Sequence, residues 1–257
     1  MREVLTNPLP NAPRPMLFSM IRVPFLLEPN YDENKPFVET NRERLIKKWG
    51  GPAGWARQKA NHDLKGRGME AGIPHFNLDR LASNTMASHR LIQHIGKTYG
   101  LDVSEAVYDC LNEYYFVDGH SLNDRPRLAA AVAEKLRVLL NANRRSSDGG
   151  VDGGLDGVSP PTEGELLTFL DSNEGRAEIM MALQALNDLG IHGIPKAIIE
   201  GRYVVDGAAH ADVFINVFRE IEQRGTILGK PVFADMLGVS AETIEAGSHR
   251  REDMIAA

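Results

Sequence analysis

The chain has 257 residues, 42% of them hydrophobic, with a net charge of −6 and a pI near 5.8. These values predict a folded protein with a full apolar core. They argue against nucleic acid as a partner, because phosphate binding needs clustered Lys and Arg. No stretch approaches the roughly 20 apolar residues that span a bilayer, and no signal-peptide core follows residues 1–3. We therefore expect no membrane partner and a cytoplasmic or other intracellular location.

The first predicted element is a strand at residues 17–30, which is rich in β-forming residues. It contains Pro24, a residue typical of an edge strand or a bulge because proline cannot donate to a ladder. From residue 36 the apolar period becomes helical. The pattern predicts helices at residues 36–50, 53–68, 83–100, 102–119, 125–143, 162–173 and 174–190.

Polar residues mark the ends of several of these helices. Asn84 or Thr85 is the predicted N-cap of the helix at 83–100, and Asp102 is that of the next helix. Residues 143–161 are dense in Gly, Ser, Asp and Pro, which predicts a flexible loop or insertion.

The last third of the chain returns to short strands. Two are predicted at 196–200 and 203–207, joined by a turn, followed by an amphipathic helix at 210–225 and a polar tail at 226–257. An order of strand, many helices, strand, strand and helix predicts an α/β, thioredoxin-like fold with an inserted all-helical domain. The predicted domains are a partial thioredoxin half at 1–35, a helical insertion at 36–189, the C-terminal thioredoxin half at 190–225, and the tail.

The turn before the second strand is the main candidate site. A helix ends near Gly190, and Ile194–Pro195 stands directly before a strand, where a proline can serve geometry because X–Pro bonds take the cis form at low cost. Ile194 and Pro195 are candidate substrate-binding residues in such a turn. An ordinary trans proline at a strand start is the alternative, and the residues alone do not decide between the two.

Cys110 is the single cysteine of the chain. One cysteine excludes an intramolecular disulfide and a thiolate-rich metal site. It shares a predicted helical stripe with Val107, Leu111 and Tyr114, so we interpret it as a small buried hydrophobe rather than a reactive thiol. The eight histidines show no metal-binding spacing, and no metal or dedicated cofactor is expected.

Four segments resemble a known family: "VPFLLEPN" (23–30), "SNTMASHRL" (83–91), "LNEYYFVDGHSLND" (111–124) and "LGIHGIPKAIIEGRYVVDGA" (189–208). They resemble the DsbA-like thioredoxin family, in particular FrnE-type oxidoreductases, which are related to 2-hydroxychromene-2-carboxylate isomerases and kappa-class glutathione transferases. The resemblance implies that Ile194–Pro195 is a cis-proline turn that holds an extended peptide or a glutathione-like thiol substrate. It also implies that His192 faces the redox site, which makes it a further candidate substrate-binding residue. His89, near Asn84 and Thr85, is expected to make an interdomain hydrogen bond rather than to act in catalysis.

The chain departs from the family in one respect that concerns chemistry. Family members place Cys-x-x-Cys at the start of a helix after a first strand, and the isomerase and transferase relatives place a serine there. Residues 1–19 contain no cysteine and have prolines at 8, 10, 13 and 15, which forbid a paired central strand. We therefore expect a shortened family member that lacks the first strand and most of the active-site helix, with "MREVL" as that helix's end.

The resemblance leaves several functions open. The family activity is thiol–disulfide oxidoreduction, which we expect to be impaired or absent without the Cys-x-x-Cys motif. A non-catalytic module that binds a peptide in the cis-proline groove is one alternative, and a glutathione-linked isomerase or transferase is another. Glutathione is the one cofactor that the resemblance would allow. A second copy of the chain is a further candidate partner, as a homodimer.

Overall fold

The structure, a computed structural model, describes residues 1–35, 39–73, 75–146 and 159–246. In these residues the β-sheet is a two-stranded antiparallel hairpin. Strand β1 (Lys196–Ile199) pairs with β2 (Tyr203–Asp206), with Ala197 opposite Val205. Glu200 and Gly201, both at positive φ, make the tight turn that hairpins of this length require. Both strands therefore lie where the sequence predicts them.

The chain divides into two compact units. Unit 1 comprises Met1–Phe25, Gln93–Glu105 and Gly175–Ala257, and unit 2 comprises Leu26–Ile92 and Ala106–Glu174. Besides the hairpin, unit 1 contains α1 (Arg2–Thr6), α9 (Arg176–Asp188), α10 (Ala211–Arg224) and α11 (Ala241–Ala246). Two helices, α5 (Met86–Tyr99) and α6 (Leu101–Asn112), contribute residues to both units.

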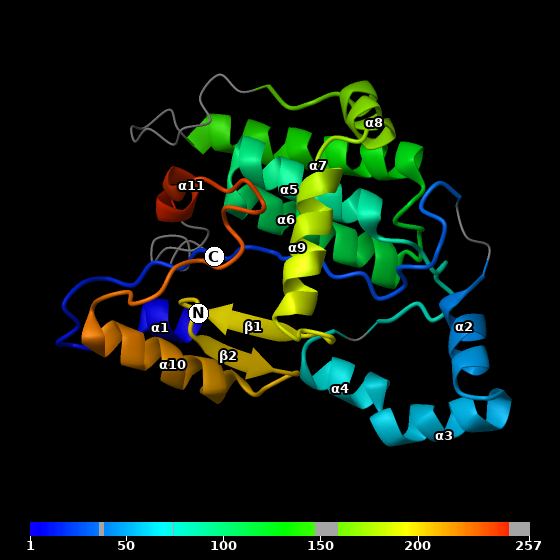
Figure 1. Cartoon of the computed structure of the whole chain (residues 1–257), viewed down its shortest axis with the longest axis horizontal. Coiled ribbons are helices and arrows are strands. Elements are labelled where there is room, and N and C mark those ends of the chain that lie inside the picture. Colours follow the sequence, from blue (N-terminus) through cyan, green and yellow to red (C-terminus); the bar gives the residue numbers. More distant parts are fainter. Residues whose placement is uncertain (36–38, 74, 147–158, 247–257) are drawn as a thin grey trace. The chain divides into compact units, whose positions relative to one another are not determined.

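In unit 1 the hairpin is covered on both faces (Figure 1). Successive side chains of a strand point to opposite faces, so the neighbours Ile198 and Ile199 join different apolar clusters. Ile199 packs on the first cluster, to which α1, α10 and Phe18 contribute. This cluster is formed by Val4, Leu5, Phe18 and Phe218. Ile198 packs on the second cluster, which α9, the start of α6 and the C-terminal segment supply. It is formed by Leu101, Ala182, Leu186, Phe233, Ala234, Leu237 and Val239.

Two predictions for unit 1 are wrong. Residues 17–30 form no strand, apart from an isolated bridge at Phe18, because the apolar side chains of this extended segment pack into the clusters instead of extending the sheet. The segment after Gly225 is not simply a polar tail, since Phe233 is 5% exposed and Leu237 is fully buried. Residues 247–257 lie outside the described part of the chain.

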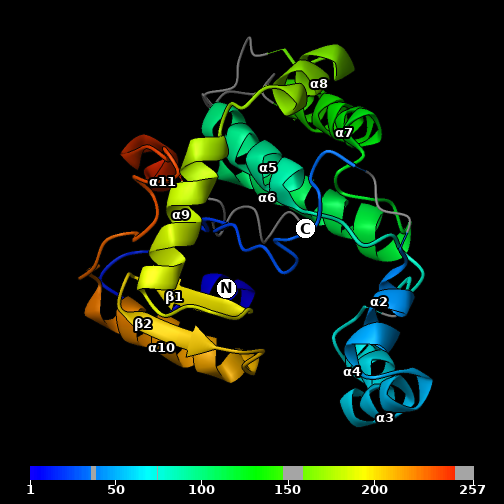
Figure 2. The same cartoon turned by 45° about the vertical axis from the view of Figure 1, so that its right-hand side comes forward.

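Unit 2 is helical (Figures 1 and 2). Its own elements are α2 (Asn41–Lys48), α3 (Pro52–His62), α4 (Leu64–Glu70), the π-helical turn η1 (Glu113–Val117), α7 (Arg125–Ser146) and α8 (Glu163–Asp171). Apolar side chains at helical spacing bury completely in it: Leu91, Val107, Leu128, Val132, Leu136 and Leu170. The predicted all-helical character of this region is therefore correct for the described residues, where the one bridge joins Thr40 and Leu81.

The helix ends differ from the prediction in three places. The helix predicted at 53–68 is divided at Asp63, whose φ of 38° interrupts the helical backbone between α3 and α4. Asp102 lies inside the first turn of α6, which begins at Leu101, and is not its cap. Of the predicted loop 143–161, residues 143–146 continue α7, and 147–158 lie outside the described residues.

No described helix combines the length and the apolar character needed to cross a bilayer. The predicted domain boundaries at 35, 189 and 225 stay predictions.

Candidate functional site

The candidate site is the turn that leads from α9 into β1. Helix α9 ends at Asp188, and Gly190 adopts a φ of 67°, which lets the backbone N–H of Ile191 donate to the Leu186 carbonyl at 2.8 Å. This arrangement is a common glycine-dependent helix stop. The chain then passes through His192 and Gly193, and the Ile194–Pro195 peptide bond is cis.

The backbone of residues 192–194 is exposed and makes no hydrogen bond to the described part of the chain. The first internal bond after the turn is made by the Pro195 carbonyl, which accepts from the Gly207 N–H at 2.9 Å. Pro195 is thereby fixed to the end of the hairpin, while the three residues before it present free N–H and C=O groups. Such groups are what an extended peptide pairs with when it binds beside a strand.

Side chains around the turn are apolar or weakly polar. Ile194 is 50% exposed and Leu189 is 54% exposed, so each leaves about half of its apolar surface in water. His192 is exposed as well. Next to Pro195, Lys196 forms an ion pair with Asp206 across the hairpin. The turn therefore contains binding groups, namely free backbone and apolar surface, and it contains no thiol or hydroxyl nucleophile.

Cys110 lies in unit 2, on α6, and is half-buried. Burial raises the pKa of its thiol, and the carboxylates of Glu113 and Asp118 raise it further, although Lys135 acts in the opposite direction. Because the thiolate is the reactive form, this cysteine is a poor nucleophile at neutral pH. The raised thiol pKa agrees with the interpretation that Cys110 is not a reactive thiol, whereas the side chain is half-buried and not buried as the sequence predicts.

Asn84, Thr85 and His89 lie at the start of α5, in unit 2. Asn84 is 4% exposed; its Nδ2 donates to the Tyr31 carbonyl at 2.7 Å and its Oδ1 accepts from the Met86 N–H at 2.8 Å. The Thr85 carbonyl accepts from the His89 N–H at 3.0 Å. His89 is half-buried, and its interdomain hydrogen bond stays a prediction.

The sequence analysis missed a buried polar network beside Asn84. The hydroxyls of Ser83 and Ser121 lie 2.9 Å apart, and Ser121 Oγ donates to Asn123 Oδ1 at 2.5 Å. Asn123 Nδ2 donates to the carbonyls of Asp32 and Lys35, at 3.2 and 2.6 Å. Together with Asn84 on Tyr31, this network holds the loop at residues 31–35. Its residues belong to two of the family-like segments, 83–91 and 111–124, so that resemblance was the signal that could have found them.

The turn and these residues are not brought together within one unit. The turn lies in unit 1, whereas Asn84, Thr85 and His89 lie in unit 2. In neither unit do the described His, Cys, Asp and Glu side chains form a group of three or more that could hold a metal ion.

Comparison with solved structures gives an informative likeness. No family model matches the chain, and no curated protein matches it. Among solved structures, it is similar to the crystal structure of a probable DsbA oxidoreductase from Streptomyces coelicolor, with a TM-score of 0.57 and 21% sequence identity. The likeness covers 80% of this chain and 76% of the other. At this level of identity it shows a shared DsbA-like fold.

Proposed function

We propose that this protein is a FrnE-type member of the DsbA-like thioredoxin family whose turn at residues 192–195 binds an extended peptide. We further propose that residues 1–257 do not themselves carry out thiol–disulfide exchange. The observation that supports the first part is the exposed backbone of residues 192–194, which is free of internal hydrogen bonds and leads directly into β1. The shared DsbA-like fold supports the family assignment.

Peptide binding at this turn follows from backbone chemistry. A peptide laid alongside residues 192–194 gains N–H and C=O partners without having to break hydrogen bonds of the protein, so the cost of binding is low. Ile194 and Leu189 offer apolar surface to its side chains, and removing that surface from water is favourable. His192 supplies an imidazole at the same turn.

The second part of the proposal follows from the number of thiols. Dithiol exchange proceeds by attack of a thiolate on a disulfide and resolution of the mixed disulfide by a second thiol. The chain has one cysteine, and burial raises the pKa of that thiol. Cys110 therefore has no resolving partner in the chain and little thiolate.

A direct test compares two versions of one fluorescein-labelled apolar peptide by fluorescence anisotropy. One version has ordinary amides and the other is N-methylated at alternate residues, which removes its N–H donors. We expect the ordinary peptide to bind and the N-methylated one to bind at least about tenfold more weakly, since each lost hydrogen bond costs about 0.5–1.5 kcal/mol. Equal affinity of the two peptides would overturn the backbone-pairing proposal.

The protein variant for this test is Ile194→Asp, which places a charge on the turn. Its matched control is Val138→Asp, because Val138 is 52% exposed on α7. Ile194→Asp should abolish binding and Val138→Asp should leave it unchanged. Competition by glutathione at the turn would favour the glutathione-linked alternative instead. In parallel, insulin reduction in the presence of dithiothreitol should proceed at the rate of the buffer alone, and catalysed turnover would contradict the second part of the proposal.

A further inference from the structure

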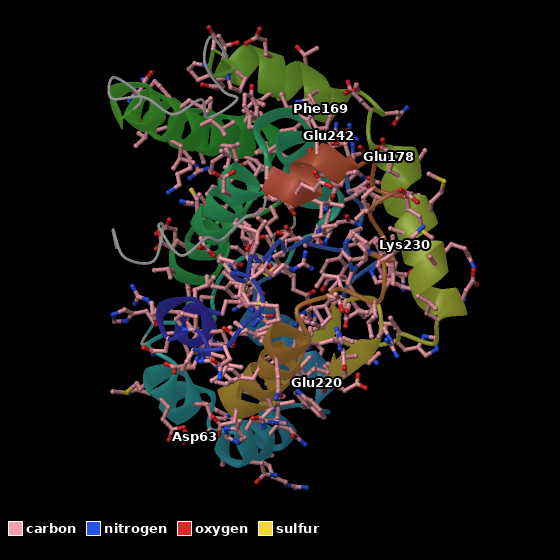
Figure 3. The ribbon with its side chains drawn as sticks, turned by 90° about the vertical axis from the view of Figure 1, so that its left-hand side faces the viewer. Asp63, Phe169, Glu178, Glu220, Lys230 and Glu242 are labelled. Carbon is pink, nitrogen blue, oxygen red and sulfur yellow. The ribbon has the colours of Figure 1, made fainter. Side chains whose placement is uncertain are left out.

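Helices α3 and α4, residues Pro52–Glu70, form a segment of unit 2 that we call the basic arm. No residue of α3 is buried. In α4, Gly68 alone is buried among the residues whose exposure the structure describes. Asp63, labelled in Figure 3, joins the two helices and caps the second by accepting from the Gly66 N–H at 3.2 Å. Isolated helices of this length are marginal in water. The arm thus has little core of its own to stabilise it.

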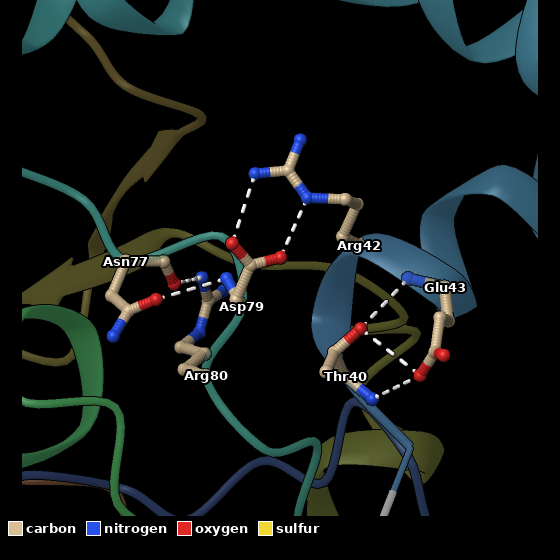
Figure 4. Close-up of polar contacts among 6 residues, drawn as sticks. All are labelled: Thr40, Arg42, Glu43, Asn77, Asp79 and Arg80. Carbon is tan, nitrogen blue, oxygen red and sulfur yellow. Dashed lines mark hydrogen bonds and ion pairs between the residues drawn. The ribbon is translucent and has the colours of Figure 1, made fainter.

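The arm also has cations without partners. Arg57, Lys59, Lys65 and Arg67 are all exposed, and none forms an ion pair with a described residue. Three of the four cations of the preceding helix, α2, behave differently. Arg42 is bound to both carboxylate oxygens of Asp79 (Figure 4), and Arg44 and Lys47 pair with Glu28 and Glu39. Lys48, the fourth cation of α2, has no ion pair to a described residue, so three of four cations are paired in α2 and none of four is paired in the arm.

The arm is positive in an acidic protein. It contains four cations and the two carboxylates Asp63 and Glu70, so its charge is +2 in a chain of net charge −6, and the remaining residues carry −8. A positively charged arm on a negatively charged molecule is attracted electrostatically to a second copy of the same chain. This complementarity identifies the class of partner.

A complementary surface exists at the end of α6. Asp109, Glu113 and Asp118 are exposed, and no described cation pairs with them; we call these three residues the acidic face. Asp109 and Glu113 are four residues apart and so lie on one side of the helix. Val117, next to them, is 44% exposed. Glu113, Asp118 and the cation Lys135 all act electrostatically on the Cys110 thiol.

We infer that the basic arm of one copy docks on the acidic face of a second copy, forming a two-fold symmetric dimer with two such contacts. In a symmetric pair each copy contributes its arm and its acidic face once, so both contacts form together. Met69 and Ile73, 62% and 49% exposed, supply apolar surface at the end of the arm, and Val117 supplies it on the acidic face. Apolar contact inside a charged rim is the usual anatomy of a protein interface.

The arm is a poor match to a lipid surface. A helix that lies on a membrane needs a broad apolar face. The large apolar side chain of α3 is Trp55, which is already half-buried, and its other apolar residues are alanines and one proline. The net charge of −6 likewise opposes binding to phosphates of lipid or nucleic acid.

The two tryptophans of the chain, Trp49 and Trp55, lie beside and within the arm, so intrinsic fluorescence reports on this segment. We expect the emission to shift to shorter wavelength as protein concentration rises, in step with dimer formation measured by analytical ultracentrifugation. Both changes should disappear in about 1 M NaCl, where the screening length falls to about 3 Å. A monomer at every concentration in low salt would overturn the inference, as would a dimer that high salt leaves intact.

Charge exchange gives the sharper test. The arm-reversed variant carries Arg57→Glu, Lys59→Glu, Lys65→Glu and Arg67→Glu, and the face-reversed variant carries Asp109→Lys, Glu113→Lys and Asp118→Lys. Each alone should dimerise at least about tenfold more weakly than the original chain, because both of its contacts join like charges. Mixed together they should form a heterodimer, because both contacts then join opposite charges.

The matched control reverses Arg2, Arg14 and Lys230, which are exposed cations of unit 1 without an ion pair to a described residue. This variant should dimerise like the original chain after correction for its total charge. Far-UV circular dichroism establishes that each variant keeps its helices, and the salt series on the original chain tests the inference without any substitution. Failure of the two folded variants to pair when mixed, or equal binding of the arm to anionic vesicles, would overturn the second copy as the partner.

Discussion

Glu200 stabilises the fold through its side chain although its backbone conformation is unfavourable for a residue other than glycine. It lies in the hairpin turn at φ 56°, a left-handed conformation that is uncommon for residues other than glycine. Its side chain is 1% exposed, and Oε1 accepts from the Arg224 guanidinium at 2.6 Å and from the Leu228 N–H. Oε2 has no hydrogen-bond partner among the described residues. The carboxylate therefore ties the turn to α10 and to the segment at 226–230.

Replacing this carboxylate should make stability less dependent on pH. Burial alone raises the pKa of Glu200, but the hydrogen bond from Leu228 and the ion pair with Arg224 outweigh it and hold the pKa below its usual value. A depressed folded-state pKa contributes stability above the unfolded value, and this contribution is lost as pH falls through the folded value. Glu200→Gln should therefore lower the free energy of unfolding by about 1–3 kcal/mol at neutral pH. The difference from the original chain should shrink as pH falls below the ordinary pKa of glutamate and should vanish only below the lowered folded-state pKa.

Urea unfolding at several pH values measures this difference. Glu134→Gln is the control, because Glu134 also has a lowered pKa, through its hydrogen bonds with Arg137, but is exposed on α7. Because solvent screens this exposed pair, Glu134→Gln should change stability much less than Glu200→Gln does at neutral pH. A loss at neutral pH that persists unchanged in acid would show that Glu200 acts through packing and not through its charge.

At the scale of elements, helix caps are decided by short sequence patterns. Helices α2 and α8 begin with complete capping boxes: Thr40 with Glu43, and Thr162 with Glu165. In α8 the Thr162 Oγ1 accepts from the Glu165 N–H at 3.2 Å, and the Glu165 carboxylate accepts from the Thr162 N–H at 2.7 Å. These bonds satisfy donors that the helix itself leaves unpaired.

We expect Thr162→Ala to destabilise the protein by about 0.5–2 kcal/mol and Thr162→Ser to restore most of the loss, because serine keeps the accepting hydroxyl. Chemical unfolding followed by circular dichroism gives the free energies. If Thr162→Ser were as unstable as Thr162→Ala, the methyl group of threonine and not the cap would be responsible.

The strand predicted at 17–30 failed for a reason that belongs to this scale. A strand is stable only when a neighbour satisfies its backbone, and composition does not show whether such a neighbour exists. In the structure this segment contributes Phe18 to the first apolar cluster, with its ring centroid 4.7 Å from that of Phe218. A few residues later, Ile21 and Val23 pack on the second cluster. The β-forming residues of this segment were wrongly assigned to a ladder; Phe18 is buried, and Ile21 and Val23 are half-buried.

At the scale of the whole molecule, the proposed dimer should link stability to concentration. A partner that binds the folded chain and not the unfolded one raises the melting temperature by mass action. We expect the melting temperature to rise by about 1–3 °C for each tenfold increase in protein concentration. Differential scanning calorimetry at low salt measures it. The arm-reversed variant should melt at one temperature regardless of concentration, and a concentration dependence equal to that of the original chain would contradict the role of the arm.

The sequence by itself determined the features that depend on near neighbours. Apolar spacing of three and four residues located the helices, the turn residues located the hairpin at 196–206, and a single cysteine excluded a dithiol within the chain. The tertiary structure alone decided what depends on contacts between distant segments. Examples are the burial of Phe233 and Leu237, the hold of Asn123 on residues 31–35, and the unpaired backbone of residues 192–194. The physical reason is that apolar periodicity depends on residues three or four positions apart. Burial and hydrogen-bond pairing depend instead on which residues from distant parts of the sequence pack against a segment.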